Sequence, residues 1–161
     1  MAVNKLSNEC LQKIFNNLEE DINSLFSTLL VNKNWCDNAV IILWRNPFNY
    51  DIELNKMAKM IPVLLSQGTL QQRIELNLQD NPIKTTYDYG WFIQQIDLRI
   101  LYNLVERWLG ENKSEDFTIV KKHLMVVSKI IFMKTKGLAE FSFSSIDHLD
   151  ECEHTVYSMC I

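Results

Sequence analysis

Four side chains in the last part of the chain are of types that bind metal ions: His148, Cys152, His154 and Cys160. A structural zinc site usually has ligands in closely spaced pairs, such as Cys-x-x-Cys with a second pair further along. The spacing here is irregular and the neighbouring residues are acidic. We therefore expect exposed histidines and partly buried cysteines, with no metal site and no cofactor.

The other two thiols belong to Cys10 and Cys36. A catalytic thiol needs an electropositive environment that lowers its pKa, and neither cysteine has a histidine partner at catalytic spacing. We expect both to be small apolar residues of the core. His123 follows two lysines on a predicted helix and is expected to face solvent. Because the sequence also lacks a phosphate-binding glycine loop, a nucleophile elbow and a zinc-binding helix motif, we predict that the protein is not an enzyme.

The elements that carry these residues are predicted to be helices, so the expected fold class is mainly α. Apolar residues at i, i+3, i+4 and i+7 recur three times in the first 45 residues, which is the spacing of one helix face. We expect helices at residues 8–18, 22–30 and 33–44. Pro47 ends the third helix and closes an N-terminal unit of residues 1–47. The three apolar stripes are Leu11, Ile14, Phe15 and Leu18; Ile22, Leu25, Phe26 and Leu29; and Trp35, Ala39, Ile42 and Leu43.

These helices carry more apolar side chains than they can bury among themselves. A unit of about 40 residues buries only roughly 60% of the surface of its unfolded chain. A surplus of apolar surface on so small a unit usually marks a binding site for another protein. The apolar residues outside the three stripes are Leu6, Leu30, Val31, Val40, Ile41 and Trp44.

The order of residues in this unit resembles the F-box, the motif by which substrate receptors attach to the Skp adaptor of Skp–Cullin–F-box ubiquitin ligases. The family pattern opens Leu-Pro-x-Glu-hydrophobic-Leu-x-x-Ile-Phe. It continues with an acidic residue, leucines and Val-x-Lys/Arg-x-Trp, and it closes on Leu-Trp-Arg. Ser7 replaces the usual proline, although serine is a good helix N-cap, and Asn32 replaces the frequent cysteine. The matching residues are Leu6, Glu9, Cys10, Leu11, Ile14, Phe15, Leu18, Asp21, Leu25, Leu29, Leu30, Val31, Lys33, Trp35, Leu43, Trp44 and Arg45.

The resemblance implies a non-catalytic F-box adaptor that binds a Skp-family protein, and through it a cullin, and presents an unidentified protein substrate for ubiquitination. The alternative is a self-contained helical scaffold or interaction protein without a ligase role. Exposure distinguishes the two, because in a scaffold residues 50–136 would cover Leu6, Phe15 and Leu29. The residues that the resemblance places at the adaptor-binding surface, or directly beneath it, are Leu6, Glu9, Leu11, Ile14, Phe15, Leu18, Leu25, Leu29, Val31, Lys33 and Trp35.

Residues 48–136 keep a helical periodicity and are expected to form a linker or substrate-binding region. Pro62 is predicted to interrupt the first helix there, and Thr69 to cap a short second one. Two longer helices should end at Gly110 and near Gly137. The connecting region before them holds an aromatic cluster, either a core anchor between helices or a recognition surface. Its members are Tyr87, Tyr89, Trp91 and Phe92.

The apolar spacing changes after the last predicted helix. Leu138, Phe141 and Phe143 fit Leu-x-x-Leu-x-Leu, the strand portion of a leucine-rich repeat, although Ile146 stands where Asn or Cys is usual. A single repeat cannot bury its own apolar face, so this segment either begins a solenoid or packs back on the helices. Residues 137–161 also contain five acidic residues and no Lys or Arg, which is equally typical of an acidic tail.

Composition limits the kinds of partner. The net charge is −4, whereas nucleic-acid binding requires clustered basic residues, so we expect no nucleic-acid partner. No apolar stretch approaches the ~20 residues that span a bilayer, and no signal peptide is recognisable, so we expect no membrane association. The four cysteines are then expected to be reduced thiols in a cytoplasmic and/or nuclear protein.

Overall fold

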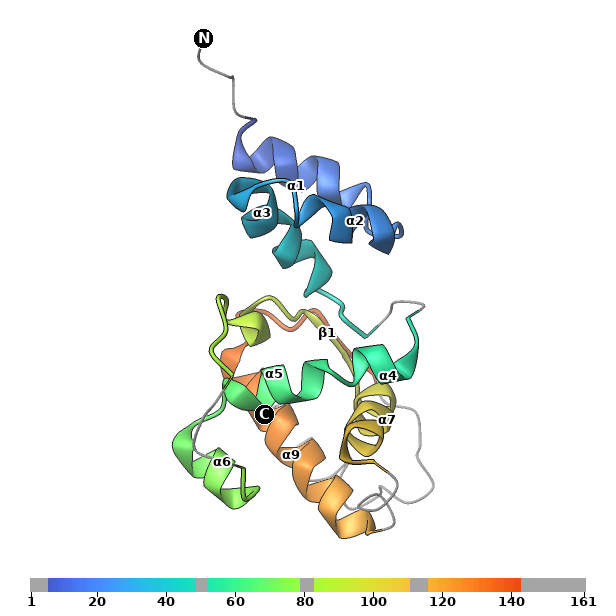
Figure 1. Cartoon of the computed structure of the whole chain (residues 1–161), viewed down its shortest axis with the longest axis vertical. Coiled ribbons are helices and arrows are strands. Elements are labelled where there is room, and N and C mark those ends of the chain that lie inside the picture. Colours follow the sequence, from blue (N-terminus) through green and yellow to red (C-terminus); the bar gives the residue numbers. More distant parts are fainter. Residues whose placement is uncertain (1–5, 49–51, 79–82, 111–115, 143–161) are drawn as a thin grey trace.

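The computed structural model describes residues 6–48, 52–78, 83–110 and 116–142, and these residues form a mainly helical fold, as the sequence predicts. Figure 1 shows a small bundle of three helices above a larger helical part, with the chain passing from one to the other after α3. We call the first the N-terminal unit (residues 6–47). We call the second the C-terminal unit (the described residues from 48 to 142).

Each helix of the N-terminal unit begins at a polar N-cap. The side chains of Ser7, Asp21 and Asn32 accept hydrogen bonds from the backbone N–H three residues further on, at 3.3, 3.1 and 3.0 Å. These bonds satisfy N–H groups that have no partner within the helix. The expectation that Ser7 is a helix N-cap is therefore confirmed, and Asp21 and Asn32 cap the other two helices. The helices are α1 (Asn8–Asn16), α2 (Ile22–Thr28) and α3 (Lys33–Leu43).

The C-terminal unit contains the remaining elements in the described residues. The predicted interruption at Pro62 is wrong, because the helix breaks earlier, at Ala58 and Lys59, and Pro62 lies in the first turn of the next helix. A first-turn proline has no intrahelical hydrogen bond to lose. The elements are α4 (Leu54–Met57), α5 (Met60–Ser66), α6 (Leu70–Glu75), the 3₁₀ turn η1 (Tyr89–Trp91), β1 (Gln95–Asp97), α7 (Leu98–Leu109), α9 (Phe117–Lys134) and β2 (Glu140–Ser142).

Helix ends in this unit follow local signals in the sequence. Thr69 and Gln72 form a reciprocal capping box at the start of α6. Gly110 ends α7 with φ of +77°, a conformation that glycine adopts without steric cost. Gly68 directly follows the C-cap of α5, and a glycine is needed there for a different reason. A Cβ at this position would lie 2.7 Å from Ile130 Cδ1, so the missing side chain lets the end of α5 approach α9 closely.

Helix α9 is the centre of the larger core and contacts both α5 and α7. Figure 1 shows it running through the C-terminal unit beneath α5. Because α9 is packed on several sides, its polar residues are also covered. His123 is only 8% exposed, its Nδ1 lies 2.8 Å from the Ile119 carbonyl oxygen, and its ring meets Trp108 edge-on. The prediction that His123 faces solvent is wrong.

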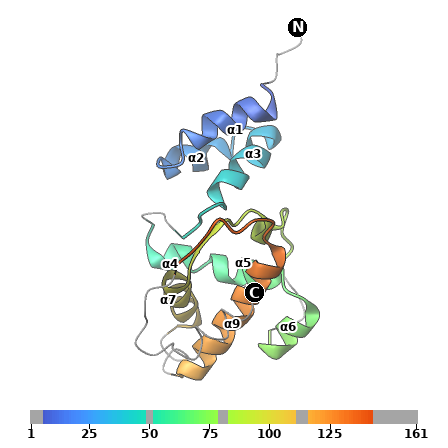
Figure 2. The ribbon, with the colours of Figure 1, turned by 180° about the vertical axis from the view of Figure 1, so that it is seen from behind.

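Two short strands form a parallel pair in which Ile96 lies opposite Phe141. Figure 2 shows β1 and β2 side by side although the whole of α7 and α9 separates them in the chain. The predicted strand near residue 141 is confirmed, whereas its partner β1 was not predicted. In the sequence, Ile93, Ile96 and Leu98 have the same apolar spacing as Leu138, Phe141 and Phe143. The register also pairs Gln95 with Glu140 and Asp97 with Ser142.

Candidate protein-interaction site

The N-terminal unit has a small core of its own. Leu11, Phe15 and Leu25 are 0–1% exposed and pack with residues of α3. The ring of Phe15 meets that of Trp35 edge-on, with centroids 5.4 Å apart. Three of the residues assigned to the adaptor-binding surface are therefore buried beneath it. Their role in this arrangement is to hold the three helices together.

Five large apolar side chains on the same unit are exposed. One is Phe26 of α2, which is 48% exposed, and we call the other four the exposed apolar set: Leu6, Ile14, Leu30 and Val31. Their exposed fractions are 49%, 44%, 88% and 55%. Ile14 and the exposed Cys10 are four residues apart and so share one face of α1, away from the face of Leu11 and Phe15. The spacing of Cys10 and Ile14 is visible in the sequence, whereas Leu6 lies before the N-cap Ser7 and outside α1. The described residues of the C-terminal unit leave all four side chains open.

The remaining residues assigned from the sequence lie between these extremes. Leu18, Leu29 and Trp35 are half-buried, and Glu9 and Lys33 are exposed. A hydrogen bond from the backbone N–H of Glu9, and a second from the Ser7 hydroxyl, lower the pKa of the Glu9 carboxyl. The carboxylate thus stays ionised in the first turn of α1, where the helix dipole favours negative charge.

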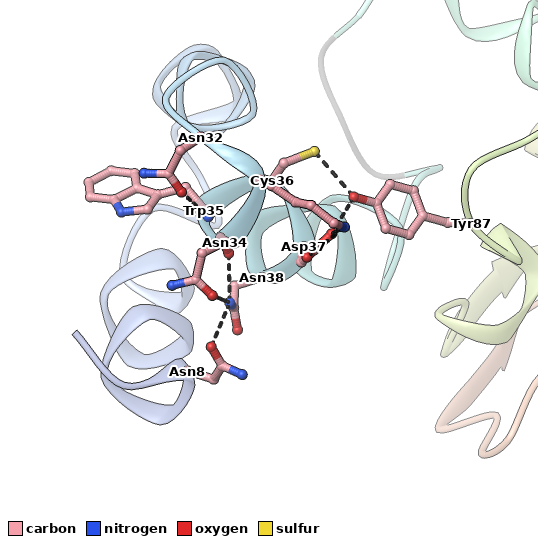
Figure 3. Close-up of polar contacts among 9 residues, drawn as sticks. Asn8, Asn32, Asn34, Trp35, Cys36, Asp37, Asn38 and Tyr87 are labelled. Atoms are coloured by element: carbon pink, nitrogen blue, oxygen red, sulfur yellow. Dashed lines mark hydrogen bonds and ion pairs between the residues drawn. The ribbon is translucent and has the colours of Figure 1, made fainter. Parts of the chain in front are cut away.

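A buried asparagine joins α1 to α3, and sequence analysis did not find it. Asn38 is 3% exposed, and its Nδ2 donates hydrogen bonds to the Asn34 carbonyl oxygen at 2.8 Å and to Asn8 Oδ1 at 3.3 Å (Figure 3). Its Oδ1 accepts a bond from Gln12 Nε2 at 3.2 Å. Each polar atom of this amide has a partner, so its burial carries no uncompensated desolvation cost.

Tyr87 connects the two units through a polar contact. Its hydroxyl donates a hydrogen bond to Asp37 Oδ1 at 2.6 Å and also lies 3.4 Å from Cys36 Sγ (Figure 3). The Tyr87 hydroxyl, and after it the Lys33 ammonium 3.0 Å from the same carboxylate, lower the pKa of Asp37. The same hydrogen bond to Asp37 raises the pKa of Tyr87.

The aromatic cluster supplies further contacts at this junction. Tyr89 stacks on Trp44 with ring centroids 4.4 Å apart. The backbone N–H groups of Gln94 and Gln95 both donate to the Arg45 carbonyl oxygen. Tyr87 and Tyr89 are therefore half-buried residues of the junction, and neither is a member of the two apolar cores. Trp91, by contrast, is 44% exposed and lies beneath the ammonium of Lys136.

The expected positions of the thiols need correction. Cys10 is exposed and Cys36 is half-buried at the junction, so neither is a core residue. Cys10 is turned away because it lies beside, not on, the buried stripe of α1. The four metal-type side chains at positions 148–160 lie outside the described residues. Within the described residues, no three His, Cys, Asp or Glu side chains come together as metal ligands.

No helix in the described part of the chain combines the length and the apolar character needed to cross a lipid bilayer. Comparison of the chain with protein-family models, with curated proteins and with solved structures gives no match.

Proposed function

We propose that the protein is an F-box-type adaptor whose N-terminal unit binds a Skp-family subunit of a ubiquitin ligase. One observation carries the proposal: the exposed apolar set lies on a unit that already has a packed core. Leu6, Ile14 and Val31 are therefore not needed to complete that core. They also belong to the residues by which the chain resembles the F-box.

Burial of this set would supply enough free energy for stable association. Full burial of one Leu, Ile or Val side chain contributes about 1.5–3 kcal/mol. A standard protein–protein interface covers about 800 Å² on each partner and depends on a few apolar anchors. Glu9 and Lys33, which are exposed on the same unit, would lie at the polar rim of such an interface.

The protein would perform no bond chemistry itself. The C-terminal unit would hold a protein substrate, and other ligase subunits would supply the ubiquitin-loaded enzyme. Holding the substrate close raises the effective concentration of its lysines at the transfer site. The contacts of Tyr87 with Asp37 and of Tyr89 with Trp44 support this role, because they connect the substrate-holding unit to the adaptor-binding unit.

The test is calorimetric titration of the purified chain with a purified Skp-family adaptor. We expect binding by the wild-type chain and at least about hundredfold weaker binding by an Ile14→Ser/Val31→Ser variant, since two apolar anchors are removed. Ile74→Ser is the matched control, because Ile74 is 53% exposed on α6 of the other unit. Absence of binding by the folded wild-type chain would remove the proposal.

The helical scaffold is the second candidate, and two residues favour it. Val40 is 5% exposed outside the small core, and Trp44 packs against the larger core. Part of the apolar surplus is thus covered within the chain. If the scaffold function is correct, the wild-type chain binds no adaptor, and Ile14→Ser/Val31→Ser behaves like Ile74→Ser in every assay.

A further inference from the structure

An apolar cleft of about 380 Å³ lies between the two units. Phe26, Leu29 and Val40 line it from the N-terminal unit, and Met57, Met60 and Tyr89 line it from the C-terminal unit. None of these residues belongs to the exposed apolar set. Leu29 is also one of the residues that the resemblance to the F-box places at the adaptor-binding surface, but the volume and the lining of the cleft do not depend on the proposed function.

The size of the cleft indicates a small molecule as its occupant. Small-molecule sites are typically clefts of about 300–1,000 Å³ with mostly apolar and aromatic walls. The volume of this cleft falls within that range, so a compact organic molecule would fit.

The polar groups of the cleft indicate what that molecule carries. Among the described lining residues, Lys56 has the one charged side chain. Its ammonium lies 3.6 Å from a Glu53 carboxylate oxygen, but both side chains are largely exposed, and such pairs contribute only about 0–1 kcal/mol. Lys56 can therefore pair with an anionic group of a ligand at little cost.

We propose that this cleft binds a small apolar acid, with its apolar body between the two walls and its anionic group at Lys56. Because each unit supplies one wall, the bound molecule would add apolar contacts across the junction beside Tyr89. The net charge of the chain is −4 and repels anions in general, so a preference for the acid would have to arise from this local cation.

Two fluorescent probes that share one apolar body separate the effect of charge from that of shape. These are 8-anilinonaphthalene-1-sulfonate and neutral N-phenyl-1-naphthylamine. We expect saturable binding of both, with the sulfonate about fivefold tighter. Lys56→Gln should remove that preference and leave binding of the neutral probe unchanged. Met60→Trp should fill the cleft and so weaken the binding of both probes by about tenfold. Met133→Trp is the control, because position 133 is 71% exposed, and it should leave the affinity for both probes unchanged.

Alkylation by iodoacetamide provides a test that needs no substitution. Cys36 lines the cleft and Cys10 is exposed on α1, so the two thiols serve as site and reference. A saturating concentration of the sulfonate probe should slow the alkylation of Cys36 and leave the alkylation of Cys10 unchanged. Mass spectrometry measures the rate at each cysteine. Equal rates with and without the probe would overturn the site. Equal affinity of the wild-type chain for the two probes would overturn the assignment to an acid.

Discussion

The Tyr87 hydroxyl donates a hydrogen bond to Asp37 across the junction between two separate apolar cores, with 2.6 Å between Oη and Oδ1. Tyr87→Phe removes this bond and keeps the ring. We expect the free energy of unfolding in urea to fall by about 1 kcal/mol. Tyr89→Phe is the control, because Tyr89 contributes a ring stack to the junction. An equal loss in the two variants would show that the Tyr87 bond adds no stability.

The same bond predicts a pH dependence. The pKa of Asp37 lies below its usual 3.8. The main cause is the hydrogen bond from the Tyr87 hydroxyl, and the second is the hydrogen bond from Lys33. A lowered pKa in the folded state adds stability above the unfolded pKa, and that stability is lost as pH falls through the folded value. The stability difference between wild type and Tyr87→Phe should therefore be constant near neutral pH and shrink below 3.8. Urea denaturation at a series of pH values measures it. In an Asp37→Asn background this trend should be absent.

The buried amide of Asn38 should be important for the stability of the N-terminal unit. Asn38→Ala leaves Gln12 Nε2 and Asn8 Oδ1 without this hydrogen-bond partner. We expect a loss of about 1–3 kcal/mol in the free energy of unfolding. Asn16→Ala, at an exposed position of α1, is the control and should change stability by less than about 0.5 kcal/mol. An unchanged free energy of unfolding in Asn38→Ala would mean that water molecules replace the lost hydrogen-bond partners.

Two leucines five positions apart should separate folding from binding. Leu25 is fully buried in the small core and Leu30 is 88% exposed. Leu25→Ala should cost about 2–5 kcal/mol of stability, measured by thermal and urea unfolding. Leu30→Ala should cost less than about 0.5 kcal/mol and weaken adaptor binding in calorimetry. A stable, folded Leu30→Ala variant with wild-type affinity would exclude Leu30 from the interface.

Close packing at Gly68 gives a prediction for the C-terminal unit. Gly68→Ala would place a Cβ 2.7 Å from Ile130 Cδ1 and should destabilise the protein by about 1–3 kcal/mol. Gly137→Ala, where a Cβ meets nothing within 4 Å, is the control and should be nearly neutral. Ile130→Val removes the clashing methyl group, so Gly68→Ala/Ile130→Val should recover part of the loss in a double-mutant cycle. Additive losses would rule out this contact as the cause.

The elements that could be predicted are those whose signals are local. The caps Ser7, Asp21 and Thr69 and the terminator Gly110 act within one helical turn, so reading them needs no knowledge of the fold. The position of Pro62 was misread because a proline is equally compatible with the first turn of a new helix.

The features that could not be predicted depend on partners distant in the chain. Two lysines precede His123 and indicate a solvent-exposed position, yet Trp108 on α7 covers the imidazole. The apolar spacing of Ile93, Ile96 and Leu98 can be seen in the sequence, but three residues were too few to identify β1 without its partner β2. For the candidate site, helical periodicity found Leu11 and Phe15 in the core. It did not show that Tyr87, fifty positions from Asp37, would complete the junction.

The parallel pairing of β1 with β2 has a consequence for how the chain folds. Ile96 and Phe141 are 45 positions apart, and all of α7 and α9 lies between them. The loss of chain entropy on closing so large a loop is offset only once those helices have packed. By contrast, the N-terminal bundle joins residues within about 30 positions of one another. We therefore expect the first three helices to assemble early in refolding and the two-stranded sheet to close last.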